Sequence, residues 1–295
     1  MPVPVVTAVA KAGSLKVHRT AERMPVMDAF EAIYRAFPMV RRMAYRAWYH
    51  RLARFAREGE VVHTNYGYAP LDGDSGPDLH EQDEPHRFGI QLYHHVATLA
   101  DIAGRDVLEV GCGRGGGASY ISRYLGTRTM TGVDLDAQAV EFCRRNHRAP
   151  GLGFRRGNSE ALPFRAGSFD AVVNVESSHC YGSMHRFLCE VKRVLRPGGR
   201  LLMADFRSRP RLRTLRRQIS HSGFTVEGET SITANVFRAL EADSERKLDL
   251  IRRRVPAPLR SVFNQFAATE GTPTYEAFRT GAWDYRSFRL APNGS

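Results

Sequence analysis

The sequence has no apolar run near the roughly 20 residues that a membrane-spanning helix requires. Its first segment, MPVPVVTAVAKAGSLK, lacks a charged stretch ahead of its weakly apolar part, so we do not expect a signal peptide there. These absences predict a cytoplasmic protein with no stable insertion into a membrane.

Cysteine is also scarce. The four cysteines are Cys112, Cys143, Cys180 and Cys189, and no two of them form a Cys-x-x-Cys pair. Such spacing would be needed for a common type of metal or redox site, so we predict reduced thiols and no bound metal.

Signs of nucleic-acid methylation are missing as well. Residues 174–177 read NVES, not the Asn-Pro-Pro-aromatic tetrad of enzymes that methylate amino groups of nucleic acids. The net charge is nevertheless +12, and residues 207–260 hold 13 Lys and Arg against 6 Asp and Glu. A basic excess can bind an anionic substrate or simply cover a solvated surface. We expect no nucleic-acid partner and leave an anionic acceptor and a homo-oligomer open.

The composition that remains is that of a globular protein, with 42% hydrophobic and 25% charged residues. From residue 106 onward, short apolar segments alternate with helical segments of 10–15 residues, a pattern typical of a parallel, doubly wound sheet. Four strands are expected at 106–113, 127–136, 168–179 and 198–207, and a further, shorter strand within 152–164. A sixth strand is expected near 224–230 and a seventh, antiparallel, at 282–292. The prediction is an α/β, Rossmann-like fold with a mostly parallel seven-stranded sheet.

The flanking segments suggest further parts of the chain. The expected organisation is a flexible tail (1–25), an N-terminal helical cap (26–100), a Rossmann-like core (101–207), and the rest of the core (208–295) with a helical lid (233–268). Two amphipathic helices are expected within 27–57, where aromatic residues suit either an apolar acceptor or ordinary helix packing.

The strongest motif is VLEVGCGRGGG (107–117), which follows a strand and opens a helix. Glycines at 111, 113 and 115 let the backbone turn tightly and approach a ligand, with Cys112 between them. Glu109 precedes the first glycine by two residues. A carboxylate there would repel a pyrophosphate but would suit the cationic amino-acid part of S-adenosylmethionine (SAM).

Two later strands end in polar residues that fit the same ligand. Asp134 lies 23 residues after Gly111, where an acid is expected to bind ribose hydroxyls, with Leu135 beside it and Asp136 as an alternative or a helix cap. Asn158, Ser159 and Glu160 follow the third strand at the adenine end. The carboxyl ends of successive parallel strands meet at one crevice, where open α/β sheets bind ligands.

These motifs, together with LRPGG (195–199), resemble those of the class I SAM-dependent methyltransferases. A closer resemblance, over roughly residues 43–290, is to the phthiotriol/phenolphthiotriol dimycocerosates methyltransferases. It rests on the strings NYGY (65–68), DEPHR (83–87), QLYH (91–94), GGGASY (115–120) and NVESSHCY (174–181). It implies SAM as cofactor, S-adenosylhomocysteine as product and an actinobacterial lipid or natural-product pathway. It also implies that Tyr66, Gln91 and Asn174 contact the cofactor.

Chemistry on a hydroxyl acceptor needs a base. His179 is the first candidate, because a histidine suits neutral pH, and Glu176 would orient it or serve as the base itself. Tyr181 and His95 are candidates for acceptor binding. The expected reaction is O-methylation of a hydroxyl on a lipid or another hydrophobic natural product. The alternatives are C-methylation of an isoprenoid, including a diphosphate, and a SAM-binding protein without catalysis.

Overall fold

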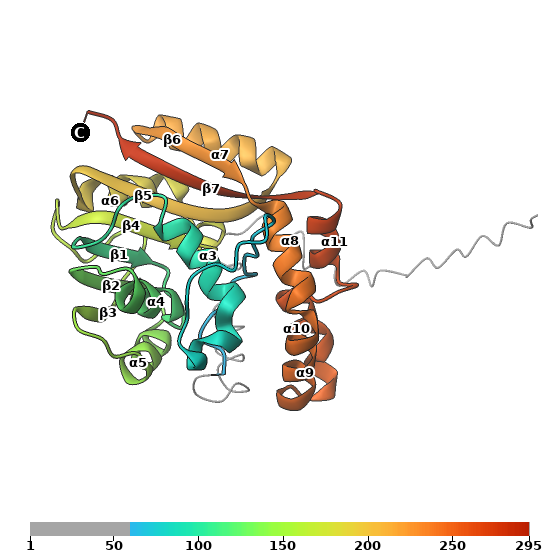
Figure 1. Cartoon of the computed structure of the whole chain (residues 1–295). Coiled ribbons are helices and arrows are strands. Elements are labelled where there is room, and N and C mark those ends of the chain that lie inside the picture. The colour runs from blue at the N-terminus through green and yellow to red at the C-terminus, as the bar shows by residue number, and fades with distance from the viewer. Residues whose placement is uncertain (1–59, 295) are drawn as a thin grey trace, which may run out of the picture. The chain divides into compact units, whose positions relative to one another are not determined.

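A computed structural model describes residues 60–294, which are built around a mixed sheet (Figure 1). The strands are β1 (Asp106–Val110), β2 (Thr129–Asp134), β3 (Leu152–Arg156), β4 (Phe169–Val175), β5 (Leu195–Ser208), β6 (Phe224–Ser231) and β7 (Trp283–Pro292). They lie in the order β3-β2-β1-β4-β5-β7-β6. The first five run parallel, and β7 runs antiparallel between β5 and β6. The predicted fold class is confirmed.

Helices cover both faces of this sheet. They are η1 (Glu81–His86), α3 (Arg87–Ala97), α4 (Gly116–Tyr124), α5 (Ala137–Asn146), η2 (Ser178–Cys180), α6 (Met184–Val194), α7 (Arg209–His221), α8 (Thr233–Ala242), α9 (Ser244–Arg254), η3 (Ala257–Leu259), α10 (Arg260–Ala267) and α11 (Pro273–Arg279). Successive strand residues point to opposite faces. Val107 therefore joins the apolar core beneath α3, α4 and α5, and Leu108 joins the core beneath α6 and α7.

Several helices begin at residues that satisfy their free backbone amides. Asp136 accepts from Gln138 N at 3.0 Å and caps α5, and Ser183 accepts from Arg186 N at 3.2 Å and caps α6. Asp136 thus takes the capping role that the sequence left open. The cap and the preceding strand together direct each helix back across the sheet.

The strand ends differ from the expected boundaries near the crevice. The third strand, expected as a short one within 152–164, is Leu152–Arg156, and the fourth ends at Val175 instead of 179. The chain leaves β4 because Glu176 adopts a left-handed conformation with a φ of 45°, which extended backbone does not allow. The residues that follow each of these two strands are therefore loop residues at the crevice.

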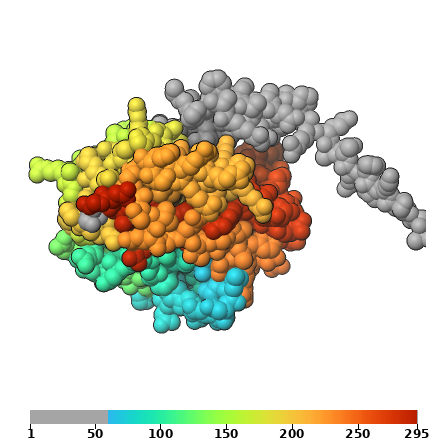
Figure 2. Space-filling model, turned by 90° about the horizontal axis from the view of Figure 1, so that it is seen from above, coloured from blue at the N-terminus to red at the C-terminus, as the bar shows by residue number. Residues whose placement is uncertain are grey.

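Helices α8, α9, α10 and α11 connect β6 to β7 and lie beyond the carboxyl ends of the parallel strands (Figure 1). They extend the helical segment expected at 233–268 to Arg279. Seen from above, the edge strand β6 and helix α7 form the centre of the surface (Figure 2). The expected tail (1–25) and the two helices within 27–57 lie outside the described residues. No helix among residues 60–294 is both long and apolar enough to cross a bilayer.

Candidate active site

The glycine loop between β1 and α4 has a backbone that side chains would obstruct. Gly111, Gly113 and Gly115 have φ values of 79°, 51° and 77°, all in the left-handed region. A Cβ atom at position 111 would lie 1.8 Å from Ser177 Oγ. The loop can therefore lie directly against the segment that follows β4, and Cys112, which is buried, packs within it.

Glu109 on β1 lies fully buried behind this loop. Its Oε1 atom accepts a hydrogen bond from Tyr93 Oη at 2.7 Å, and its Oε2 atom has no hydrogen-bond partner among the described residues. Burial raises the pKa of Glu109 to about 7. A buried carboxylate oxygen without a donor is costly, and an ammonium group would satisfy it. The residue therefore fits the cationic end of SAM.

Asp134 joins the end of β2 to the glycine loop. Its carboxylate accepts from Gly113 N and from Asp136 N, each at 2.9 Å. Burial raises the pKa of this carboxyl group. Leu135, the next residue, is 39% exposed. The structure thus holds Asp134 at the crevice, and its contact with ribose remains a prediction.

The turn after β3 is held by its own polar side chains. Asn158 Oδ1 accepts from Glu160 N at 3.1 Å, and Glu160 Oε1 accepts from Gly182 N at 2.9 Å. Ser159 between them is buried. These bonds tie the turn after β3 to the loop after β4. The sequence did not predict this connection, and adenine contact by these residues stays a prediction.

Asn174 connects the ends of β1 and β4. It is fully buried, and its Nδ2 atom donates to Val110 O at 2.8 Å and to Tyr181 Oη at 2.9 Å. Tyr181 Oη also lies 2.7 Å from Ser177 Oγ, and its ring packs edge-on against Phe187. Tyr181 therefore connects the loop after β4 to the sheet. Its contact with the acceptor stays a prediction.

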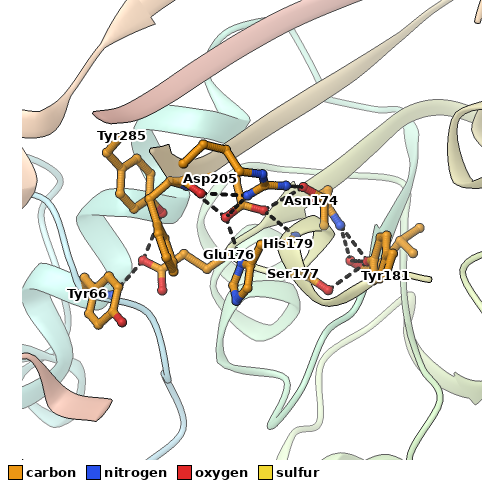
Figure 3. Close-up of polar contacts among 12 residues, drawn as sticks. Tyr66, Asn174, Glu176, Ser177, His179, Tyr181, Asp205 and Tyr285 are labelled. Atoms are coloured by element: carbon orange, nitrogen blue, oxygen red, sulfur yellow. Dashed lines mark hydrogen bonds and ion pairs between the residues drawn. The ribbon is translucent and has the colours of Figure 1, made fainter. Parts of the chain in front are cut away.

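Glu176 is the first residue after β4, and its left-handed φ is an uncommon conformation for a side chain of this size. Its Oε1 atom accepts from Tyr66 N at 2.8 Å and from Tyr285 Oη at 2.9 Å (Figure 3). Burial raises the pKa of Glu176 to about 7, although both hydrogen bonds oppose that rise. The carboxylate is therefore fixed in place and changes protonation near neutral pH.

His179 is held by Asp205 at the end of β5 (Figure 3). His179 Nδ1 lies 2.9 Å from Asp205 Oδ1, and the His179 backbone N–H donates to Oδ2 at 3.0 Å. The same carboxylate accepts from Ser178 Oγ at 2.6 Å and pairs with Arg207 at 2.9 Å. Burial lowers the pKa of His179, but Cys180 and Asp205 outweigh it and raise the value to about 10. His179 is therefore an imidazolium at neutral pH.

Aromatic rings surround these polar groups. The Phe206 ring centre lies 4.7 Å from that of His179, 4.9 Å from Trp283 and 5.4 Å from Tyr66. Phe278 on α11 completes the aromatic cluster, 5.3 Å from Tyr66. The aromatic cluster places apolar, polarisable surface beside Glu176 and His179.

An extended segment, residues 60–69, crosses the crevice, and we call it the strap. Gly116 N donates to Val62 O at 3.2 Å, Tyr66 N donates to Glu176, and Ala69 N donates to Asn235 O on α8 at 3.1 Å. Within 10 residues the strap therefore contacts the glycine loop, the loop after β4 and the helices that follow β6.

Two predicted site residues have other contacts. Gln91 on α3 is buried, and its Nε2 atom donates to Ser75 O at 3.2 Å, so it supports the loop before η1. His95 lies 3.0 Å from Ser287 Oγ on β7 and stacks on Tyr68, and burial lowers its pKa to about 4. These contacts assign both residues to packing around α3, and any ligand contact by them stays a prediction.

Several residues of this site were not predicted, among them Asp205, Tyr93 and Tyr285. Asp205 lies near the carboxyl end of a predicted strand, as Asp134 does, and that position was a signal that could have identified it. Tyr93 lies within the string QLYH, which was noted without a role for the tyrosine. Tyr285 gave no signal, because an isolated tyrosine in an alternating strand has the same pattern as a core residue.

Comparison with known proteins is consistent with this site. Residues 108–203 match a family described as a methyltransferase domain. The chain is 40% identical over 244 residues to a phthiotriol/phenolphthiotriol dimycocerosates methyltransferase of Mycobacterium tuberculosis, covering 83% of this chain and 90% of the relative. It is 39% identical over 249 residues to a fatty-acid O-methyltransferase of Mycolicibacterium smegmatis, covering 84% and 90%.

A solved structure shares the fold. The geranyl diphosphate C-methyltransferase of Streptomyces coelicolor A3(2), in complex with Mg²⁺, geranyl diphosphate and S-adenosyl-L-homocysteine, superposes with a TM-score of 0.60 at 21% identity. The superposition covers 83% of this chain and 98% of that one. The glycine loop, the Glu109 oxygen without a hydrogen-bond partner and the identity to these relatives agree. The chain is a SAM-dependent methyltransferase that belongs to the phthiotriol/phenolphthiotriol dimycocerosates methyltransferase family.

Proposed function

We propose that this enzyme O-methylates a hydroxyl group of a lipid or of another hydrophobic natural product. The observation that carries the proposal is the position of Glu176, a half-buried carboxylate with a pKa of about 7, among the residues of the aromatic cluster. A base with a pKa near the working pH accepts a proton efficiently and is still largely available.

The protonation states favour Glu176 over His179 as the base. A hydroxyl oxygen must lose its proton as it attacks, so the base must be unprotonated beforehand. Glu176 is about half ionised at neutral pH because its pKa is about 7. His179, with a pKa of about 10, already carries its proton. We therefore assign the proton transfer to Glu176 and a hydrogen-bonding, orienting role to His179.

The remaining roles follow from the fixed positions of the site residues. Bound SAM supplies a methyl group on a sulfonium, and its transfer requires an aligned acceptor in a site without bulk water. The strap and the aromatic cluster exclude water from the neighbourhood of Glu176. Tyr66 N and Tyr285 Oη fix the carboxylate, so the proton is accepted at a defined place.

The acceptor class is inferred from the aromatic cluster and from the relatives. Rings of Phe206, Trp283 and Phe278 offer apolar surface for a hydrocarbon chain. The relatives are named for phthiotriol/phenolphthiotriol dimycocerosates and for a fatty acid, both of which are lipids. Three of the six lid arginines pair with acids: Arg246 with Asp243, Arg253 with Asp249 and Arg254 with Glu60. The names of the relatives, more than this pairing, favour a lipid hydroxyl over an anionic acceptor.

The test is a panel of acceptors incubated with the purified enzyme and SAM, with methylated products identified by mass spectrometry. The panel contains a long-chain lipid with a free hydroxyl, the same lipid with that hydroxyl blocked, a long-chain fatty acid and a prenyl diphosphate with and without Mg²⁺. We expect methylation of the free hydroxyl alone. A product from the blocked lipid or the prenyl diphosphate would contradict the proposal and support C-methylation, and a fatty-acid ester would move the acceptor to a carboxylate.

A variant separates catalysis from simple SAM binding. Glu176→Gln keeps the size of the side chain and an oxygen for its two donors but cannot take a proton. We expect it to bind SAM normally and to lose turnover. Unchanged turnover would refute the assignment of the base.

A further inference from the structure

Tyr93 is a side chain from the N-terminal helix α3 that reaches the glycine loop. Its hydroxyl donates to Glu109 Oε1 at 2.7 Å, and both residues are buried, Tyr93 at 7% exposure and Glu109 at 0%. A hydrogen bond to a buried carboxylate is stronger than one between neutral groups. Tyr93 is therefore the side chain that restrains the one acid of the glycine motif.

The Tyr93 ring is itself fixed by the backbone of α4. A Cβ atom at position 117 would lie 2.0 Å from Tyr93 Cε1, so the ring occupies the space that a side chain at 117 would need. The His63 ring on the strap lies 5.8 Å from the Tyr93 ring on another side. The third glycine of GGG (115–117) thus makes room for the tyrosine.

The two oxygens of Glu109 are used differently. Oε1 is engaged by Tyr93, whereas Oε2 is buried and accepts no hydrogen bond from another side chain among residues 60–294. The backbone N–H of Ala118 also lowers the pKa of Glu109. A carboxylate fixed at one oxygen presents the other in a single direction. The Oε2 atom of Glu109, which is oriented and has no side-chain donor, is therefore suited to accept hydrogen bonds from a cationic group.

We propose that Tyr93 is a positioning residue for cofactor binding, which orients Glu109 so that Oε2 receives the ammonium group of the methionine part of SAM. This inference concerns the cofactor and holds whichever acceptor the enzyme uses. It gives α3, which lies outside the glycine motif, a direct part in cofactor affinity.

The test compares Tyr93→Phe with the wild type in calorimetric binding of SAM and of 5′-methylthioadenosine, which lacks the amino-acid part. We expect the variant to weaken SAM binding by about tenfold, the effect of one charge-assisted hydrogen bond, and to leave methylthioadenosine binding unchanged. Tyr120→Phe is the matched control, because Tyr120 is also buried and its hydroxyl is hydrogen-bonded to His94 Nδ1 at 2.7 Å, not to Glu109. It should bind both ligands as the wild type does.

A double-mutant cycle tests whether Tyr93 acts through Glu109. Glu109→Gln should weaken SAM binding, and adding Tyr93→Phe should weaken it no further, because the oriented charge is already gone. Equal loss of both ligands in Tyr93→Phe, unchanged SAM binding, additive losses in the cycle, or an equal loss in Tyr120→Phe would each overturn the proposal.

The pH dependence of SAM binding gives a second measurement. The ionisable groups that face Glu109 or Tyr93 are Cys112 in the loop, Asp134 at the end of β2, Glu176 after β4, His63 on the strap and Tyr285 on β7. Burial raises the pKa of Glu109, and the Tyr93 hydrogen bond lowers it, so SAM affinity should increase as pH rises through about 7. In Tyr93→Phe the midpoint should move to higher pH. An unmoved midpoint would contradict an action through Glu109.

Discussion

His179 Nδ1 lies 2.9 Å from Asp205 Oδ1, a contact between residues 26 positions apart that brings the loop after β4 onto the end of β5. Arg207 and Ser178 contact the same carboxylate, so its charge is shared among three partners. Burial raises the pKa of Asp205, yet these partners hold it well below its usual range. The carboxylate is therefore ionised at any working pH and keeps His179 charged.

Asp205→Asn should lower the pKa of His179 toward neutrality, because the variant removes the carboxylate that opposes burial, although Cys180 still raises that pKa. We expect kcat/KM to fall by about tenfold, the effect of losing one charge-assisted hydrogen bond that orients His179. The alkaline limb of the pH–rate profile should move from about pH 10 toward neutrality. Because Arg207 would lose its partner, Asp205→Asn/Arg207→Met serves as a second variant. An alkaline limb that stays in place in both would refute this role.

Glu176→Gln should lower kcat by about 10²–10⁴-fold, because the amide cannot accept the proton of a hydroxyl. SAM affinity, measured by calorimetry, should stay within twofold, as expected for about 0.4 kcal/mol. Tyr285→Phe removes one of the two donors to Glu176 and should leave most of the turnover. A larger loss in Tyr285→Phe than in Glu176→Gln would argue against the carboxylate as the base.

The wild-type pH profile follows from the same carboxylate. Glu176 works as a base only when ionised, and its pKa is about 7, so kcat should rise as pH increases from 6 to 8 and then level off. Activity should fall again only near pH 10, where His179 loses its proton. Stopped-assay rates between pH 5.5 and 10.5 would show these limbs. A rate that declines between pH 6 and 8 would contradict the assignment of Glu176 as the base.

Asp134→Ala should weaken SAM binding by about 10–100-fold, since we predict that Asp134 binds the ribose hydroxyls and since the hydrogen bond from Gly113 N is lost. Asp134→Asn should be milder because its amide oxygen can still accept from Gly113 N. Asp136→Ala is the control: it removes the cap of α5, which costs about 1 kcal/mol of stability, and should not change the affinity. Equal losses at positions 134 and 136 would contradict a ribose contact.

Asp106→Asn should destabilise the fold without affecting SAM binding. Asp106 accepts from Arg128 at 2.9 Å, Thr129 at 2.7 Å and Arg196 at 2.8 Å, far from the glycine loop at the other end of β1. We expect the free energy of unfolding to fall by about 1–3 kcal/mol, measured in urea. The hydrogen bond from Arg128 holds the pKa of Asp106 well below its usual range. The contribution is therefore present at neutral pH and lost on strong acidification.

Much of the fold could be predicted because its signals are local. The glycines of the 111–117 loop, the acid at 134 and the alternation of apolar strands with helices depend only on residues close in sequence. The predicted end of the fourth strand was wrong because of the backbone conformation of a single residue, Glu176. Nothing in NVESSH (174–179) indicates that Glu176 adopts a positive φ. The predicted strand therefore ran four residues beyond the end of β4.

The polar contacts of the site were harder to predict, because they join distant segments. The Tyr285–Glu176 hydrogen bond spans 109 residues, and the Tyr66–Glu176 bond spans 110. Which tyrosine of an alternating strand faces a given carboxylate depends on strand order and register, and sequence periodicity determines neither. The preference for Glu176 over His179 as the base also came from burial and from Asp205, which are properties of the assembled crevice.

The position of β7 between β5 and β6 determines when the sheet edge can form in a newly synthesised chain. β6 leaves the ribosome before β7, yet among the strands of residues 60–294 it pairs with β7 alone, so that edge of the sheet stays incomplete until β7 has been made. That strand also carries Tyr285, a donor to Glu176, and Ser287, the partner of His95. The nascent protein therefore completes the sheet and both hydrogen bonds to Glu176, the base that we propose, in the same late step.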